Sequence, residues 1–272
     1  MADDQTTYII NANMPLLDFL RIPETQHVKD LDDPGTTLLY AKIIQNKPFL
    51  KNIYLDFYSI FKEAVNYQEN DKRVFVELGS GGGFLKKVIP TVTTTDVIAL
   101  PDIDQCFSAL NMPYGNNTVD AFFMIDVLHH IPDASRFLKE ATRCLKPGGR
   151  IIMIEPSNTF FSRIIYRFFH QEPFDPKAGW KLSSDGPLSS ANIAIPWIIF
   201  IRDRKLFETN YPELKITNIY NHTPFRYLIS GGVTVRQLLP NFSYNFIKII
   251  ESVLTPLNNY LGMFITIELE NN

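Results

Sequence analysis

Residues Val74 to Phe84 read VFVELGSGGGF, an apolar run that ends in Glu77 and is followed by glycines at alternate positions. The run predicts a buried parallel strand, and the string FLKKVI after it predicts the start of a helix. Glycine in the turn between them lets the backbone approach a ligand closely, because no Cβ stands in the way. A helix N-terminus behind such a turn offers unpaired N–H groups. The stretch therefore predicts a turn that binds a polar small molecule.

The spacing of the glycines narrows the class of ligand. A dinucleotide fold needs G-x-G-x-x-G, and Phe84 takes the place of the third glycine, which disfavours a dehydrogenase. The alternative is that the glycine turn binds no ligand and only connects the strand to the next element. Asp96 lies 19 positions after Glu77, near the end of a second predicted strand, TVTTTDVIAL. Nucleotide folds hydrogen-bond a ribose diol through an acid about 20 residues beyond the glycine turn.

The chain continues with a second ordered set of signals between residues 109 and 156. An apolar run over 119–126 predicts a strand that ends at Asp126, and Asp133 is a suitable N-cap for a helix. Pro147, Gly148 and Gly149 end that helix before another apolar strand, residues 150–155. Strand–helix–strand units of this kind pair in parallel with right-handed crossovers.

These motifs, in this order, closely resemble class I S-adenosylmethionine-dependent methyltransferases. The matching features are acid-x-G-x-G-x-G at residues 77–83, the acid Asp96, Met112-Pro113-Tyr114, the His129-His130 pair and Leu145-Lys146-Pro147-Gly148-Gly149. The strings HQEPFDP and SGGV, which begin at His170 and Ser230, resemble poorly characterised bacterial members of the same group. The specific resemblance covers roughly residues 73–157, and the last strands match by order alone.

The resemblance implies an α/β, Rossmann-like fold. It comprises a mostly parallel seven-stranded sheet with helices on both faces, an N-terminal helical extension and a helical cap after the fifth strand. It also implies S-adenosylmethionine as cofactor. The residues implied to bind it are Glu77, Gly79, Ser80, Gly81, Gly83, Asp96, Val97, Ser108, Ala109, Leu110, Asp126 and Val127. Ser108 stands where the family often has an acid for the adenine amino group, which removes one charge-assisted hydrogen bond, and Asp104 is a candidate substitute.

The length and composition are those of a globular enzyme with a single large domain, or one domain with a cap. The chain has 272 residues and a formal net charge of −3, without a long Lys/Arg run, so we expect no nucleic-acid partner. No secretory signal and no membrane-length apolar stretch are visible, which predicts a cytoplasmic protein. Cys106 and Cys144 are expected to be buried free thiols. No Cys/His cluster has metal-ligand spacing, so no metal is expected. The sequence does not indicate an oligomeric state.

We expect four segments: an N-terminal helical extension (1–72), a cofactor-binding core (73–157), a cap (158–213) and a C-terminal completion of the sheet (214–272). The 56 residues of the cap are too many for a plain connection. Its aromatic residues are expected to wall an acceptor site or to pack on the sheet, and both roles are open to different residues. Aromatic residues of the N-terminal helices are further candidates for the walls of that site. The helix predicted near 243–261 is amphipathic. We expect it to face the core, with contact to a membrane surface as the less favoured alternative.

The predicted reaction is in-line methyl transfer to oxygen, nitrogen or carbon of a small, partly apolar or lipid-like acceptor. In such a reaction the protein mainly aligns the two reactants. The candidate general bases are His129, His130 and His170, with His222 and Glu155 as further candidates. A non-catalytic cofactor-binding or scaffold protein that retains the fold is the alternative function.

Overall fold

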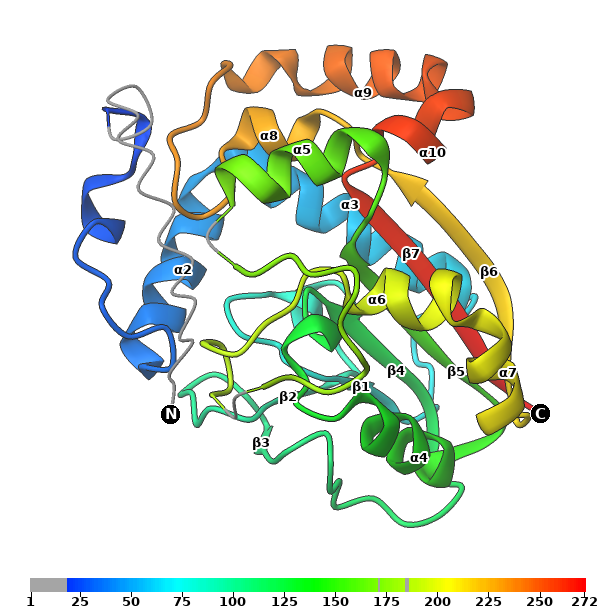
Figure 1. Ribbon diagram of the computed structural model, residues 1–272. Helices are drawn as coiled ribbons and strands as arrows, with labels where there is room; N and C mark the ends of the chain where they lie inside the picture. Colours follow the sequence, from blue (N-terminus) through cyan, green and yellow to red (C-terminus); the bar gives the residue numbers. More distant parts are fainter. Residues whose placement is uncertain (1–18, 171, 184–185) are drawn as a thin grey trace, which may run out of the picture.

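A seven-stranded sheet in the order β3-β2-β1-β4-β5-β7-β6 forms the centre of the computed structural model (Figure 1). The structure describes residues 19–170, 172–183 and 186–272. The strands are β1 (Phe75–Glu77), β2 (Thr93–Asp96), β3 (Gln105–Cys106), β4 (Val119–Ile125), β5 (Leu145–Pro156), β6 (Leu214–His222) and β7 (Phe264–Asn271). Neighbours from β3 to β5 pair in parallel, and β7 pairs antiparallel with both β5 and β6. This order confirms the predicted class I methyltransferase fold.

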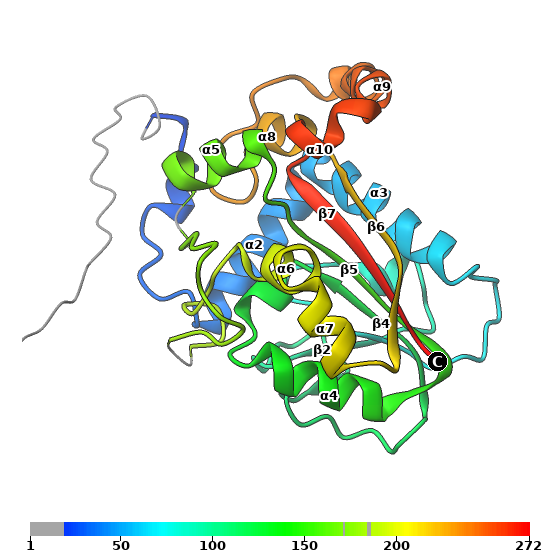
Figure 2. The same ribbon diagram turned by 45° about the vertical axis from the view of Figure 1, so that its right-hand side comes forward.

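Helices cover both faces of the sheet (Figures 1 and 2). The longer ones are α2 (Pro34–Asn46), α3 (Pro48–Ala64), α4 (Ala134–Cys144), α5 (Phe160–Phe169) and α9 (Tyr244–Val253). The shorter ones are α6 (Ile195–Trp197), α7 (Arg204–Asn210), α8 (Arg226–Ser230) and α10 (Asn258–Leu261), and a π-helical stretch over Ile198–Arg202 joins α6 to α7. One hydrophobic cluster packs α4 and residues 194–211 on one face, and a second packs α3 on the other.

The predicted helix after the glycine turn is wrong. Only one 3-10 turn, Leu85–Lys87, follows the turn, because few residues separate it from β2 and Pro90 lies among them. Helix α3 occupies that face instead, and its Phe57, Tyr58 and Phe61 pack with Leu85 and Ile89. The face that the sequence assigned to a local helix is therefore covered by the N-terminal region.

Two further expectations fail. Cys144 is buried as predicted, but Cys106 is exposed, because β3 is the edge strand of the sheet. The late helix is not continuous: α9 ends at Val253, and a 3-10 turn over Thr255–Leu257, which contains Pro256, precedes α10. Helix α9 meets the core through Tyr244 and Ile247, but most of its apolar side faces away from the core, since Phe246, Ile249 and Val253 are 63%, 61% and 73% exposed.

Candidate cofactor and active site

The site begins at the glycine turn, where the strand order reverses between β1 and β4. Ligands of open α/β sheets bind beyond the carboxyl ends of the strands at such a point. Gly79 and Gly81 have φ values of 64° and 45°, in the left-handed region that favours glycine. A Cβ on Gly83 would lie 2.9 Å from both the Ser80 carbonyl oxygen and the Tyr58 hydroxyl. The turn thus requires glycine for its conformation and for its close contact with α3.

Two buried carboxyl groups flank this turn. Ser80 Oγ donates a hydrogen bond to Glu77 Oε2 over 2.7 Å, and burial raises the pKa of Glu77 to about 8. Asp96, at the end of β2, accepts hydrogen bonds from the backbone N–H groups of Gly81 and Ile98, both at 2.9 Å. Burial also raises the pKa of Asp96. Asp96 therefore holds the glycine turn in place while its carboxylate stays at the site.

A third carboxyl group follows β4. Asp126 has a φ of 55°, a conformation that non-glycine residues rarely adopt. Backbone strain of this kind costs on the order of 1–3 kcal/mol and clusters at functional sites. Burial raises the pKa of Asp126 to about 8, an effect that the charge of His129 partly opposes. Three carboxyl groups, those of Glu77, Asp96 and Asp126, thus meet at the carboxyl ends of three neighbouring strands.

These groups open into one cavity of about 450 Å³, within the usual range for small-molecule sites. Every residue that the resemblance implied for the cofactor lines it: Glu77, Gly79, Ser80, Gly81, Gly83, Asp96, Val97, Ser108, Ala109, Leu110, Asp126 and Val127. His129, His130 and His170 line it too. The fold therefore brings the predicted cofactor residues and the predicted bases into a single space.

The three histidines converge on Glu172. Glu172 Oε2 lies 3.4 Å from His129 Nε2 and 3.9 Å from His170 Nδ1, and its Oε1 lies 3.6 Å from His130 Nε2. On the opposite side of the first imidazole, His129 Nδ1 donates to Glu155 Oε2 over 2.7 Å. His130 Nδ1 lies 3.0 Å from the Ser190 carbonyl oxygen, to which it donates. The two neighbouring rings are thus fixed with both Nε2 atoms toward the same carboxylate.

Their charges differ. Burial alone would lower the pKa of His129, but its hydrogen bonds to Glu155 and Glu172 outweigh burial and raise the pKa to about 10. Burial and the neighbouring His129 charge lower the pKa of His130 to about 4. Burial opposes ionisation of Glu172, yet its contacts with His129 lower the pKa to about 2. At neutral pH the site therefore holds a cationic His129, an anionic Glu172 and an uncharged His130.

The same cluster has a geometry that could hold a metal ion. The ligand atoms of His129, His130 and Glu172 lie within 4.8 Å of one another, as do those of Asp126, His129 and Glu155. Sequence spacing predicted no metal, because Glu172 lies far from the His pair in the sequence. A carboxylate or carbonyl on the second ring nitrogen is the usual support of a metal-binding histidine.

Several predicted alternatives lie elsewhere. His222 does not line the cavity, and its ring nitrogens contact the hydroxyls of Thr223 and Thr266 at 2.9 and 2.8 Å. Asp104 is bound to Lys86 and to the Thr94 backbone N–H, so it does not substitute for Ser108 at the cavity. Glu155 is fully buried and accepts from the backbone of Val127 and Leu128, which makes it a support for His129.

The sequence indicated aromatic residues of the N-terminal helices as candidate walls, but it did not identify which residues line the cavity. Helices α2 and α3 contribute Thr37, Tyr40, Tyr54 and Tyr58, and other walls are Glu172, Leu188 and Tyr227. Gly82 was missed as well: a Cβ there would lie 2.8 Å from the backbone of Ala41, so this glycine lets α2 approach the turn. The only sign of Gly82's role in the sequence was that it is a fourth glycine, at a position that the motif does not require.

The aromatic residues of segment 158–213 divide between roles. Tyr166 lines the cavity, whereas Phe200 and Phe207 are fully buried against the sheet. Phe160 and Phe168 do neither, since 71% and 57% of their surface is exposed. The expectation that the aromatic residues of this segment wall the site thus holds for few of them.

Comparisons with known proteins agree with this geometry. Residues 76–153 match the family model described as a methyltransferase domain. A demethylmenaquinone methyltransferase from Symbiobacterium thermophilum is 35% identical over 134 residues, 48% of this chain and 52% of that protein. One from Bacillus mycoides is 42% identical over 50 residues, 18% and 21% of the two chains. The chain spans about half the length, or less, of these curated relatives.

Among solved structures, geranyl diphosphate C-methyltransferase from Streptomyces coelicolor is similar with a TM-score of 0.47 and 14% identity. That match covers 85% of this chain and 83% of that one. The family model spans the glycine turn, the His pair and most of β5, and it ends two residues before Glu155. Residues 76–153 of the chain are therefore similar to the methyltransferase domain family.

Proposed function

We propose that this protein transfers a methyl group from S-adenosylmethionine to oxygen, nitrogen or carbon of a small, partly apolar acceptor. One observation carries the proposal: the residues implied to bind the cofactor and the candidate bases line the same cavity, at the carboxyl ends of β1, β2 and β4. Glu172 lines this cavity as well.

The residues present fit a cationic, nucleoside-containing cofactor. Glu77 and Asp126 supply carboxyl groups near the glycine turn, and Asp96 stands at the position expected for a ribose diol. In addition, Thr37 Oγ1 lines the cavity, is buried and has no hydrogen-bond partner in the part of the chain that the structure describes. Buried polar groups are normally paired, so an unpaired hydroxyl here supports a ligand with a polar group.

When bound, S-adenosylmethionine supplies a methyl group that is already activated by its sulfonium. The protein's task is then to align the acceptor and to manage one proton. Uncharged His130 presents Nε2 to the cavity and is suited to accept a proton from an acidic acceptor O–H, N–H or C–H. Cationic His129, held by Glu155, is suited to attract an anionic acceptor oxygen. Glu172 positions the His129 ring, and the Ser190 carbonyl oxygen orients the His130 ring.

The walls support an aromatic or otherwise apolar acceptor. Tyr40, Tyr54, Tyr166 and Tyr227 and apolar side chains such as Leu188 line the cavity. Aromatic walls with a few convergent polar groups are the usual form of such a site. The relatives named as demethylmenaquinone methyltransferases make a hydroxylated quinone-type acceptor the first class to test.

The test is methyl transfer from methyl-labelled S-adenosylmethionine to a panel of phenols, reduced quinones and amines, with products identified by mass spectrometry. We expect a labelled product with wild type and with the exposed-site control His27→Asn. We expect a loss of about 10²- to 10⁴-fold with His130→Asn, the usual range for removing a general base. Cofactor binding without transfer to any class of acceptor would favour the non-catalytic alternative.

A further inference from the structure

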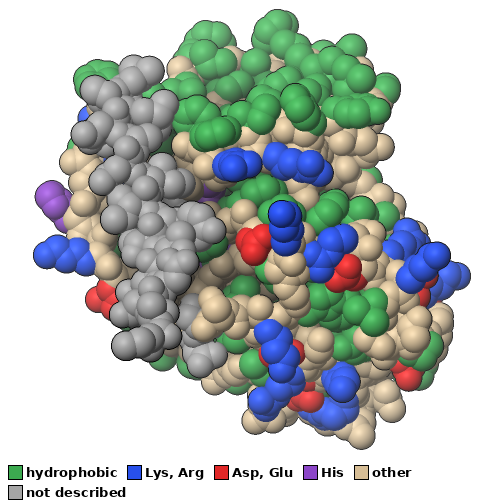
Figure 3. Space-filling model, in the orientation of Figure 1, with side chains coloured by type: hydrophobic (Ala, Val, Ile, Leu, Met, Phe, Trp, Pro, Cys, Tyr) green, Lys and Arg blue, Asp and Glu red, His purple; other side chains and the backbone are tan. Residues whose placement is uncertain are grey.

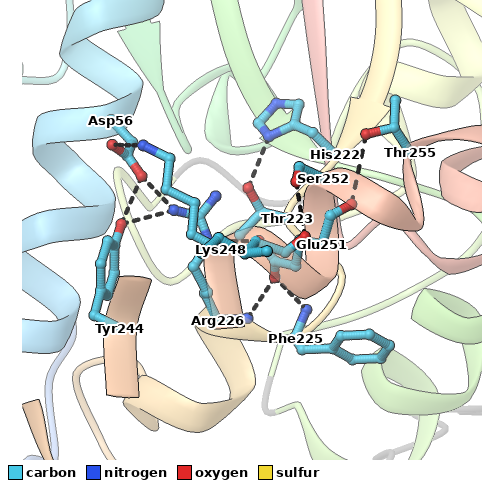
Figure 4. Close-up of polar contacts among 11 residues, drawn as sticks. Asp56, His222, Thr223, Phe225, Arg226, Tyr244, Lys248, Glu251, Ser252 and Thr255 are labelled. Carbon is cyan, nitrogen blue, oxygen red and sulfur yellow. Dashed lines mark hydrogen bonds and ion pairs between the residues drawn. The ribbon is translucent and has the colours of Figure 1, made fainter. Parts of the chain in front are cut away.

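Helix α9 is amphipathic, but its polar side faces inward. Figure 4 shows that Tyr244 and Lys248 of α9 meet Asp56 of α3, while Glu251 of α9 pairs with Arg226 of α8. Glu251 Oε1 also accepts hydrogen bonds from the backbone of Phe225 and Arg226 at 2.8 and 2.7 Å. A network of charges, together with the packing of Tyr244 and Ile247 on the core, therefore fixes the inner side of α9 to the protein.

The outer side of α9 is apolar and exposed. Phe242, just before the helix, is 86% exposed, and Phe246, Ile249 and Val253 are more than half exposed. Leu257 and Tyr260 extend this surface over α10, which packs against α5. On α5, Phe160, Ile164, Phe168 and Phe169 are 40–71% exposed. Figure 3 shows the result as a broad hydrophobic area across the top of the molecule. We call these ten residues the apical patch.

The segments that carry the apical patch have an excess of positive charge. Residues 158–170 contain Arg163 and Arg167 and no acid. Between residues 226 and 262 the single acid is Glu251, which is buried and paired with Arg226. Arg163 donates to the Asn158 side chain, and Arg167 stacks over Phe168, so neither shows an ion pair with a described carboxylate. An exposed apolar surface with cations and without exposed carboxylates complements an anionic lipid surface.

We propose that the apical patch docks this protein onto the surface of an anionic bilayer. The insertion is interfacial: among the described residues, no helix is both long and apolar enough to cross a membrane. A second copy of the chain fits the patch less well, because a two-fold contact buries the same patch from both copies, and the segments that carry it supply Arg163 and Arg167 without an exposed carboxylate to pair with them. Aromatic and aliphatic side chains enter the headgroup boundary, and the arginines meet the lipid phosphates.

This docking would place the cavity beside the membrane. Helix α5 carries both the exposed Phe168 and the cavity residue Tyr166, and α8, which anchors α9, carries the cavity residue Tyr227. The proposal does not rest on methyl transfer, because lipid binding is measured without cofactor or acceptor. It does explain how a lipid-like acceptor would reach the cavity.

The test is sedimentation of the full chain with vesicles of phosphatidylcholine alone or of phosphatidylcholine mixed with phosphatidylglycerol. We expect binding to the mixed vesicles that weakens with salt. The double variant Phe242→Ser/Phe246→Ser should bind at least about tenfold more weakly. Arg163→Gln and Arg167→Gln should each cost about fivefold on anionic vesicles and little on neutral ones.

The matched control is Leu206→Ser on α7, an exposed leucine remote from α9 (Figure 1). It should bind vesicles like wild type, and all variants should retain the wild-type circular dichroism spectrum. Equal binding by wild type and the Phe242/Phe246 variant would overturn the proposal, as would no binding to either vesicle. If the chain instead dimerises in light scattering and the double variant makes it monomeric, the patch is a protein interface and the lipid proposal is wrong.

Discussion

Glu77 is implied to bind the cofactor, but its buried carboxyl group lowers the stability of the fold when it is ionised. Its carboxyl group is fully enclosed, and burial raises its pKa to about 8. A group with a raised folded-state pKa stabilises the fold below its unfolded-state pKa, and this contribution is lost as pH rises through the folded-state value. The ligand-free protein should therefore lose stability between about pH 4.5, the usual pKa of a glutamate, and about pH 8, the folded-state pKa of Glu77.

The variant Glu77→Gln should remove part of that loss, because the amide keeps an acceptor for Ser80 Oγ without a buried charge. At pH 9 we expect it to be more stable than wild type by on the order of 1–4 kcal/mol, with weaker cofactor binding. Calorimetric melting across this pH range is the measurement, with exposed Glu69→Gln as control. A wild-type melting temperature that stays constant from about pH 4.5 to about pH 8 would contradict the assignment.

Asp96 connects the second strand to the glycine turn. It accepts from Gly81 N–H and leaves its carboxylate at the cavity wall, so Asp96→Ala removes both the turn's support and the ribose contact. Cofactor binding should weaken by on the order of 1.5–3 kcal/mol, the range for hydrogen bonds to a charged group. Titration calorimetry with S-adenosylhomocysteine measures it. Exposed Asp102→Ala should bind like wild type, and an equal loss in both variants would exclude the ribose role.

The acidic residues at the ends of strands could be predicted from the sequence. Glu77, Asp96 and Asp126 could be placed because parallel strands bring their carboxyl ends to one edge of the sheet. Tyr54, Glu172 and Tyr227 could not be placed, because their approach to the cavity depends on packing between segments far apart in the sequence. The unpaired hydroxyl of Thr37 is likewise invisible without the three-dimensional structure.

At the scale of elements, hydrophobic periodicity predicted that a segment is helical more reliably than it predicted which side of the helix faces the core. The spacing of Phe246, Ile249 and Val253 shows an apolar side, but period alone does not say whether that side meets the core or solvent. For α9 the polar side is inward, held by Asp56 and Arg226. The missing helix after the glycine turn has a different cause: the connection to β2 is too short for one.

Three hydrogen bonds to Asp32 connect the N-terminal extension to the segment after β5. Asp32 accepts hydrogen bonds from the backbone of Leu188 and Ser189 at 2.6 and 2.9 Å, and Ser189 Oγ donates to it at 2.6 Å. Leu188 and Leu31 both line the cavity, so this contact closes one wall.

Asp32→Ala should open that wall with little effect on stability, because the contact is near the surface. We expect the dissociation rate of bound S-adenosylhomocysteine to rise several-fold and the melting temperature to change little. Stopped-flow fluorescence with Tyr or Trp emission reports the rate, and exposed Glu24→Ala is the control. An unchanged rate would show that the 186–190 wall does not limit release.

At the scale of the whole molecule, three regions of the chain line the cavity. The α/β core supplies the glycine turn and its carboxyl groups, α2 and α3 supply tyrosines, and the segment after β5 supplies Tyr166, His170 and Glu172. The core alone matches the methyltransferase family model. The walls outside the core are therefore where the choice of acceptor is expected to reside.

The central claim is that this cavity binds S-adenosylmethionine, and titration calorimetry with S-adenosylhomocysteine and with NADH tests it most directly. We predict one S-adenosylhomocysteine site per chain, weakened by Asp96→Ala and unaffected by Asp102→Ala, and no NADH binding. Tight binding of NADH without binding of S-adenosylhomocysteine would contradict the claim.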